Sequence, residues 1–290
     1  MPTESESVER GYLEGPVDLR ETMESGQVFR WRRTSERPVE YTLVYRGEGL
    51  ILRQRDGGVE YESTGLSRDE VRSFLGLDVS LPEIESEIEF DERVRRARDA
   101  YPGLRVVDDE FFPCLVSFVV SANNRIPRIH DLVLALAEAY GTEVPGFGHS
   151  FPSAERLANA TETELRDLGL GYRAPYVLES ARMIADGEFD VESVRSLDYH
   201  DAHEELQRLV GVGPKVADCV MLFSLDYPMA VPLDTWMEKT MERHYPDLVG
   251  SNYRETTDAF RERFGRYSGY AQNYLFHYIR RGEGRPSDSR

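Results

Sequence analysis

The sequence is short of cysteine, lysine and long hydrophobic runs, and each shortage excludes a class of protein. Its two cysteines, Cys114 and Cys219, are too few for a disulfide framework or for a four-thiolate metal or iron–sulfur site. The apolar run at 115–120 is far shorter than the ~20 residues of a membrane-spanning helix. The first ten residues lack the basic and apolar regions of a secretory signal. We therefore expect a protein of the reducing cytoplasm with no membrane partner.

Lysine is equally scarce, since only Lys215 and Lys239 occur among 35 basic residues. Against them stand 53 acidic residues, which gives a formal net charge of −18. Acidic, arginine-rich chains are typical of a high-salt cytoplasm, where salt screens charge repulsion to ~3 Å at 1 M. The composition predicts salt adaptation, with an ordinary acidic protein as the alternative. The charge also disfavours a nucleic-acid partner, but that argument weakens if salt adaptation has changed the surface.

The hydrophobic pattern predicts an α+β protein with a small N-terminal antiparallel β-sheet domain and a larger all-α region. Apolar and polar residues alternate between 27 and 63 in segments separated by turn residues, which indicates three or four strands. Residues 1–15 are polar and are expected to be loose. We predict domains at 1–106 and 107–280 and a disordered tail at 281–290. Helices are predicted at 67–77, 91–101, 109–122, 127–140, 153–159, 162–168, 174–186, 201–210, 214–225, 235–245, 255–264 and 269–280.

The segment 206–225 has the pattern of a helix–hairpin–helix motif. An amphipathic helix runs into Gly211, Val212 and Gly213, and a second helix starts at Pro214. Proline suits the first helical position, and the glycines allow a tight turn that exposes backbone N–H groups able to bind phosphate. Such a motif contacts DNA without distinguishing its sequence. A plain turn between core helices fits the glycines equally well.

Lys215 and Asp234 are the candidate catalytic residues. Lys215 lies in a first helical turn, where the positive end of the helix disfavours an ammonium group. A neutral amine is the form that a Schiff-base nucleophile needs, and arginine does not supply it. Asp234 follows Pro232 at an N-cap position. The alternatives are a solvated surface lysine and an aspartate that only caps a helix.

Two further stretches have the residue types of a DNA-contacting surface. Residues 121–125 (SANNR) end an apolar helix with amide side chains, and 169–174 (GLGYRA) place an aromatic residue and an arginine at a helix start. Tyrosine can wedge between bases, and arginine can contact a base edge through two hydrogen bonds. Ordinary capping and packing would explain each stretch taken alone.

Seven segments in collinear order give the chain a close resemblance to the eukaryotic-type 8-oxoguanine DNA glycosylases of the helix–hairpin–helix superfamily. They are 25–32 (SGQVFRWR), 74–81 (FLGLDVSL), 113–129 (PCLVSFVVSANNRIPRI), 168–177 (LGLGYRAPYV), 211–220 (GVGPKVADCV), 230–234 (AVPLD) and 269–276 (GYAQNYLF). The resemblance implies a glycosylase and AP lyase that flips 8-oxoguanine out of double-stranded DNA. It implies no cofactor and no catalytic metal, a monomer, and a nucleoid-associated place in the cytoplasm.

The resemblance also implies a role for each matching residue. Lys215 would attack C1′ of the damaged nucleoside, and Asp234 would stabilise the oxocarbenium ion. The Gly26 carbonyl would accept the N7–H that 8-oxoguanine has and guanine lacks. The other implied base-pocket residues are Gln272 at the Watson–Crick edge, Phe276 and Cys219 on the two faces of the ring, and Phe223 and Pro232. The implied DNA contacts are Asn123 and Asn124 at the vacated space, Tyr172 as a wedge, Arg128 and Arg173 at the opposite cytosine, and the hairpin residues 211–213.

The chain departs from the family pattern at three positions. Trp236 and Ile279 stand where the family commonly has a phosphate-contacting histidine and the aspartate that holds it, and Phe223 replaces a common methionine. Two alternatives remain: a glycosylase for another damaged purine, and a non-catalytic helix–hairpin–helix DNA-binding module. Lys215 argues against alkylpurine enzymes, which do not need this lysine. Segment 25–32 argues against the module.

Overall fold

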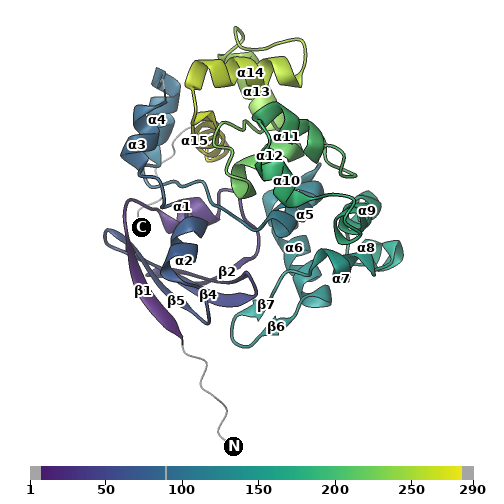
Figure 1. Cartoon of the computed structure of the whole chain (residues 1–290). Helices are drawn as coiled ribbons and strands as arrows, with labels where there is room; N and C mark the ends of the chain where they lie inside the picture. Colours follow the sequence, from purple (N-terminus) through teal and green to yellow (C-terminus); the bar gives the residue numbers. More distant parts are fainter. Residues whose placement is uncertain (1–7, 89, 283–290) are drawn as a thin grey trace, which may run out of the picture.

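The sheet is larger than the sequence predicts. In the computed structural model, which describes residues 8–88 and 90–282, a five-stranded antiparallel sheet has the order β1-β5-β4-β3-β2 (Figure 1). The strands are β1 (Glu9–Glu14), β2 (Trp31–Glu36), β3 (Val39–Tyr45), β4 (Glu48–Arg55) and β5 (Gly58–Ser63). Strands β2 to β5 fall inside the predicted 27–63 region. The α+β prediction is confirmed.

The expectation of a loose N-terminus is wrong for residues 9–14, which form β1. This strand pairs with β5 in the register Tyr12 to Glu60 and Leu13 to Val59. Leu13 is its one buried residue within the described range, so the sequence shows no alternation of polar and apolar side chains there. The strand forms because β5 offers unpaired backbone groups at the edge of the sheet.

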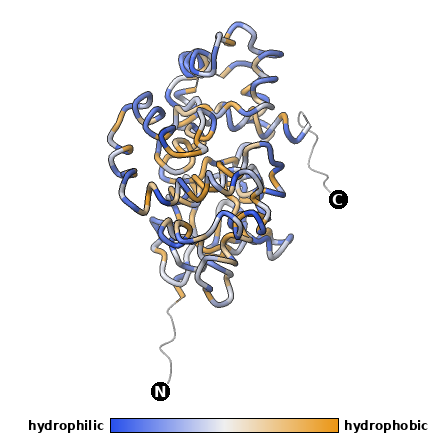
Figure 2. Tube along the Cα trace, turned by 90° about the vertical axis from the view of Figure 1, so that its right-hand side faces the viewer, coloured by the Kyte–Doolittle hydropathy of each residue, from blue (hydrophilic) through white to orange (hydrophobic). Residues whose placement is uncertain are grey.

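Helices cover the sheet and form the rest of the molecule. α1 (Leu19–Met23) and α2 (Arg68–Phe74) pack with the sheet around one hydrophobic core. Their side chains meet alternate strand residues such as Leu43, Leu50 and Tyr61, as expected for a sheet with one buried face. Most apolar residues lie along inner segments of the trace (Figure 2).

The remaining helices share a second core. They are α3 (Leu81–Ser86), α4 (Glu92–Ala100), α5 (Phe111–Ser121), α6 (Ile126–Tyr140), α7 (Ala154–Ala158), α8 (Glu162–Asp167), α9 (Ala174–Ala185), α10 (Val191–Arg195), α11 (Tyr199–Leu206), α12 (Pro214–Ser224), α13 (Thr235–His244), α14 (Tyr253–Phe264) and α15 (Ser268–Arg280). A 3-10 turn, η1 (Gly171–Arg173), precedes α9, and a short hairpin of β6 (Glu143–Val144) and β7 (Gly148–His149) follows α6. Every predicted helix has a counterpart, with ends shifted by up to four residues. No helix is predicted from the sequence at α1, α3 or α10, which have five or six residues each.

The two parts are joined by buried polar contacts. Arg30, which precedes β2, is buried and makes ion pairs with Asp109 and Glu110 just before α5. The helices α3 and α4 precede residue 106, yet Leu81, Ile84 and Val94 belong to the core of the helical part. The domain limits at 106 and 280 stay predictions, and residues 283–290 of the predicted tail lie outside the described residues.

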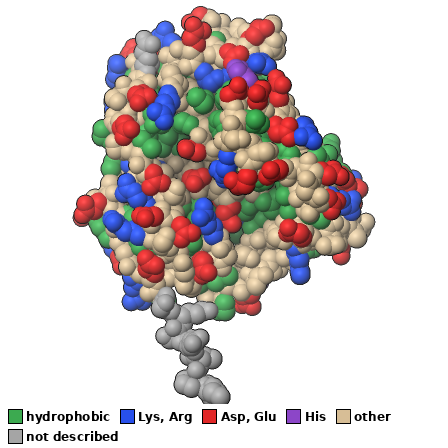
Figure 3. Space-filling model, in the orientation of Figure 1, with side chains coloured by type: hydrophobic (Ala, Val, Ile, Leu, Met, Phe, Trp, Pro, Cys, Tyr) green, Lys and Arg blue, Asp and Glu red, His purple; other side chains and the backbone are tan. Residues whose placement is uncertain are grey.

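The acidic charge is distributed over the surface. Figure 3 shows acidic and basic side chains interspersed on one face of the molecule. Many form ion pairs, such as Arg53 with Glu62. Salt adaptation stays a prediction. Within residues 8–88 and 90–282, no helix has both the length and the apolar character needed to cross a membrane.

Candidate active site and DNA-binding surface

A pocket of about 340 Å³ lies where α5, α12, α15 and the start of α13 meet the loop before β2. This volume falls within the range of about 300–1,000 Å³ common for small-ligand sites. The structure brings all the predicted catalytic and base-pocket residues to its lining, although the sequence separates them widely. They are Lys215, Asp234, Gly26, Cys219, Phe223, Pro232, Gln272 and Phe276. Their individual roles stay predictions.

Lys215 lies half-buried in the first turn of α12. Its Nζ donates to Ser121 Oγ at 3.0 Å and lies 5.0 Å from the centre of the Phe118 ring. Ser121 Oγ in turn donates to the Phe118 carbonyl at 2.6 Å. The amine is therefore held between α12 and the end of α5, pointing into the pocket lining. Sequence reasoning missed Ser121 as the lysine's partner, and its only signal was a polar residue that ends an apolar helix.

Asp234 is the N-cap of α13 and also faces the pocket. Its Oδ1 accepts hydrogen bonds from the backbone N–H groups of Trp236 at 3.0 Å and Met237 at 2.9 Å. Because both bonds end on Oδ1, Oδ2 can face a positive charge that develops in the pocket. Asp234 can therefore cap the helix with one carboxylate oxygen and stabilise a positive charge with the other.

The pocket wall beside Lys215 is apolar. Burial raises the pKa of the Cys219 thiol to about 12, against the opposing effect of the nearby Lys215 charge, so it stays protonated at neutral pH. Phe223, one turn further along α12, stacks on Phe118 with ring centres 5.5 Å apart. Gln272 is buried in α15, and its Nε2 donates to the Pro232 carbonyl at 2.9 Å. These contacts give the pocket an apolar wall with the Gln272 amide at its edge.

Gly26 closes the pocket from the side of the sheet domain. Its φ of +97° suits glycine, and a Cβ there would lie 2.6 Å from Ile126 Cδ1. The neighbouring Gln27 fixes this loop, since its Nε2 donates to the Arg105 carbonyl at 2.8 Å and its Oε1 accepts from the Val107 N–H at 2.9 Å. The Gly26 backbone is therefore held rigidly at the pocket.

The predicted DNA-contact residues gather at the end of α5. Asn123 adopts a left-handed conformation with φ of +52°, and its Nδ2 donates to the Tyr172 hydroxyl at 3.1 Å. Tyr172 is 47% exposed, as a wedge residue would need to be. Asn124 donates back to the Val120 carbonyl at 2.8 Å, so its side chain caps the end of α5.

The two arginines that are predicted to contact the opposite base differ in their exposure. Arg128 is exposed, and its Nη2 packs against Gly169. Arg173 is only 7% exposed; its Nε donates to the Ala122 carbonyl at 2.8 Å, and its guanidinium lies 4.3 Å from the centre of the Tyr172 ring. In this structure Arg173 caps the end of α5.

The hairpin before α12 is tight, with one open side. Gly211 has a φ of +86°, and a Cβ there would lie 2.6 Å from the Tyr176 Cβ. The Val212 side chain is buried in the helical core, so only its backbone is available to a ligand. A Cβ on Gly213 would meet nothing within 4 Å, and in the described chain no side chain caps the start of α12. This geometry suits a phosphate group.

Comparison with known proteins agrees with this geometry. Residues 13–115 match the family model "8-oxoguanine DNA glycosylase, N-terminal domain", and residues 116–266 match "HhH-GPD superfamily base excision DNA repair protein". The chain is 34% identical to N-glycosylase/DNA lyase OGG1 of Arabidopsis thaliana, over 88% of this chain and 75% of that protein. The chain belongs to the 8-oxoguanine DNA glycosylase/lyase family.

Two other members of the glycosylase/lyase family align along nearly their whole length. The probable N-glycosylase/DNA lyase of Methanothermobacter thermautotrophicus is 30% identical over 92% of this chain and 95% of that protein. A crystal structure of the Clostridium acetobutylicum 8-oxoguanine glycosylase/lyase, in complex with double-stranded DNA containing cytosine opposite 8-oxoguanine, superposes with a TM-score of 0.84. It is 30% identical and covers 95% of this chain and 98% of that chain.

This glycosylase/lyase differs from the expected family pattern at the rim of its pocket. Trp236 lines the pocket and is 60% exposed, whereas Ile279 packs against the helical core. Neither side chain carries a charge, so these two positions supply no ionic contact to a phosphate. In the described ranges, no cluster of three or more His, Cys, Asp or Glu side chains is arranged to hold a metal ion.

Proposed function

We propose that the protein flips 8-oxoguanine, paired with cytosine, out of duplex DNA, excises it through a Schiff base on Lys215, and cleaves the strand by β-elimination. The observation that carries this proposal is that Lys215 and Asp234 line the same pocket. They come from the starts of two different helices, and Gly26 and Gln272 line this pocket too. The family membership supports it, as do the activities for which the relatives are named.

The chemistry begins with the neutral amine of Lys215 attacking C1′ of the sugar. The bond from C1′ to the base breaks, the base leaves with the electron pair, and it takes up the proton that the attached nitrogen of Lys215 loses. Asp234 stabilises the positive charge that develops on the sugar. The sugar ring opens to a protonated Schiff base as O4′ takes up a proton. Water then removes a C2′ proton, and the C3′–O bond breaks to release the 3′ phosphate.

Recognition of the oxidised base depends on the Gly26 carbonyl and on the pocket residues that surround the base. The carbonyl accepts the N7–H of 8-oxoguanine. Guanine has an acceptor at N7, and two facing acceptors buried together would cost about 1–3 kcal/mol. Phe276 and Cys219 lie against the two faces of the ring, and Gln272 bonds its Watson–Crick edge.

The DNA surface lies beside the pocket opening. Asn123 fills the space that the flipped nucleotide vacates, and Tyr172 wedges into the stack. Arg128 and Arg173 contact the opposite cytosine, and the N–H groups of the hairpin bind phosphate. Unstacking costs a few kcal/mol, which these contacts offset. The enzyme acts as a monomer in this scheme.

Borohydride trapping tests the proposal. We expect a covalent protein–DNA band on a labelled duplex with 8-oxoguanine opposite cytosine, and none on the undamaged duplex, in high-salt buffer. Release of free base without a band would indicate a glycosylase that does not form a Schiff base. Equal binding to both duplexes with neither product would indicate a non-catalytic DNA-binding module.

A methyl group at position 26 is expected to impair base excision. The Gly26→Ala change forces a left-handed conformation that costs an L-residue about 1–2 kcal/mol, and it places Cβ against Ile126. We expect the single-turnover rate of 8-oxoguanine release to fall by about tenfold or more. The control is Gly47→Ala, a positive-φ glycine whose Cβ would meet nothing within 4 Å. Equal rates in the two variants would contradict the role of Gly26.

A further inference from the structure

A fully buried carboxylate lies behind the pocket, on the helix that carries Lys215. Asp218 follows Lys215 by three residues in α12 and has no exposed surface. The Tyr199 hydroxyl of α11 donates to its Oδ1 at 2.5 Å, and the Tyr253 hydroxyl of α14 donates to its Oδ2 at 2.6 Å. The two tyrosines therefore hold the two oxygens of one carboxylate.

The Tyr253 hydroxyl makes two further contacts that the Tyr199 hydroxyl does not make among the described residues, and one of them is with the Val231 carbonyl at 3.2 Å. The Leu233 N–H donates to the Tyr253 hydroxyl at 3.2 Å. Leu233 immediately precedes Asp234, so one phenol hydroxyl connects the helix of Lys215 to the segment that ends in Asp234. On its other side this segment is held by Gln272 at the Pro232 carbonyl.

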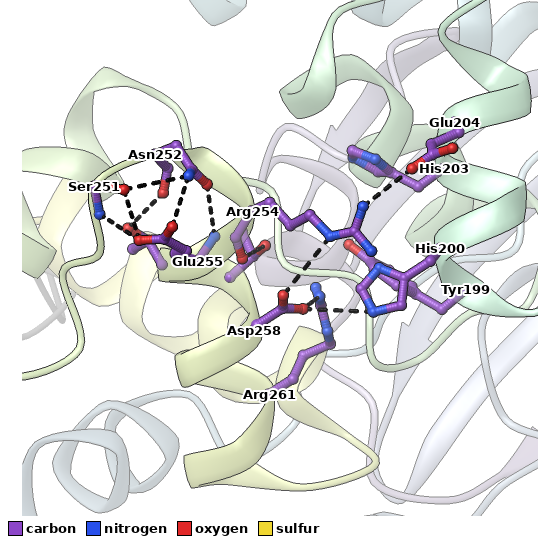
Figure 4. Close-up of polar contacts among 12 residues, drawn as sticks. Tyr199, His200, His203, Glu204, Ser251, Asn252, Arg254, Glu255, Asp258 and Arg261 are labelled. Atoms are coloured by element: carbon purple, nitrogen blue, oxygen red, sulfur yellow. Dashed lines mark hydrogen bonds and ion pairs between the residues drawn. The ribbon is translucent and has the colours of Figure 1, made fainter.

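The position of Tyr253 is itself fixed by the start of α14. Asn252 Oδ1 accepts from the Glu255 N–H at 2.9 Å, and the Ser251 hydroxyl donates to Glu255 at 2.7 Å. Figure 4 shows this cap and, beside it, Arg254 reaching across to Glu204 of α11, at 3.0 Å. The first turn of α14 is therefore anchored on both sides of the tyrosine.

The burial of Asp218 restricts the movement of the two tyrosine hydroxyls that donate to it. Burial raises the pKa of its carboxyl group, while His203, at 3.8 Å, and the two phenol hydroxyls oppose the rise. A tyrosine that moved away would leave a buried carboxylate oxygen unsatisfied, which is strongly unfavourable. The hydroxyl of Tyr253 is therefore a fixed point for the Leu233 N–H.

We propose that Tyr253 is a positioning residue that sets the placement of Asp234 relative to Lys215. It touches neither DNA nor the damaged base. It acts through the backbone of Leu233 and through Asp218, so its kinetic consequence rests on the proposed function. Tyr199 stabilises the same carboxylate without this connection.

The matched variants Tyr253→Phe and Tyr199→Phe test the proposal, since each removes one hydroxyl from Asp218. We expect the single-turnover trapping rate to fall by about tenfold or more in Tyr253→Phe, because small misplacements of reacting groups slow chemistry strongly. Tyr199→Phe should stay within about twofold of wild type. Binding to a duplex with a stable abasic-site analogue should be unchanged in both. Equal slowing in the two variants would overturn the proposal.

Two further measurements separate positioning from a general loss of structure. In an Asp234→Asn background, Tyr253→Phe should cause no additional slowing, because Tyr253 acts through Asp234; a further fall by the same factor would refute it. Amide hydrogen exchange should increase at 231–234 in Tyr253→Phe alone. If wild type traps no damaged duplex, the proposed function fails, yet the exchange result still decides whether Tyr253 holds this segment.

Discussion

The Lys215→Gln variant is expected to form no borohydride-trapped complex, with base release slowed by more than about a thousandfold. Glutamine is similar in length but has no nucleophilic amine, so neither attack on C1′ nor the Schiff base is possible. Its side-chain amide can still donate to Ser121, which now accepts the hydrogen bond from Lys215 Nζ. Folding and duplex binding should therefore be kept, as checked by thermal unfolding and by a gel-shift titration.

The control for this prediction is the same change at the second lysine. Lys239 is exposed on α13, and Lys239→Gln removes the same charge. We expect Lys239→Gln to trap and cleave like wild type. Strand cleavage by Lys215→Gln at the wild-type rate would mean that the amine of Lys215 is not the nucleophile.

The Asp234→Asn variant is expected to slow the chemical step by roughly 10²–10³-fold while leaving the fold intact. The loss follows because a neutral amide no longer stabilises the positive charge on the sugar. Asparagine caps helices about as well as aspartate, so the bonds from Trp236 and Met237 to Oδ1 can persist. Single-turnover kinetics and the thermal unfolding midpoint separate the two effects.

Asp198 provides the matched control, because it caps α11 through a bond from the Asp201 N–H at 3.0 Å and does not line the pocket. Asp198→Asn should change neither rate nor stability appreciably. An unchanged rate in Asp234→Asn would reduce Asp234 to a helix cap.

Apart from α10, the helices after residue 108 were predictable, as were the strands β2 to β5, because their signals are local. The cap at Asp234 and the glycine turn at 211–213 involve residues two to four apart in sequence. The same is true of the cap of α2, in which the Ser67 side chain accepts from the Glu70 N–H. Interactions at that range leave a readable pattern of residue types. β1 has no such pattern, because its formation depends on an edge that β5 supplies.

Residue type and local spacing were enough to predict the fold class, the hairpin and the candidate nucleophile and carboxylate. The groups that those residues face are known only from the folded chain. Ser121 lies 94 positions from Lys215, and Tyr253 lies 35 positions from Asp218. Arg173 likewise caps a carbonyl 51 positions away at Ala122. Such partners are selected by how helices pack around a shared core, and packing leaves no fixed spacing in the chain.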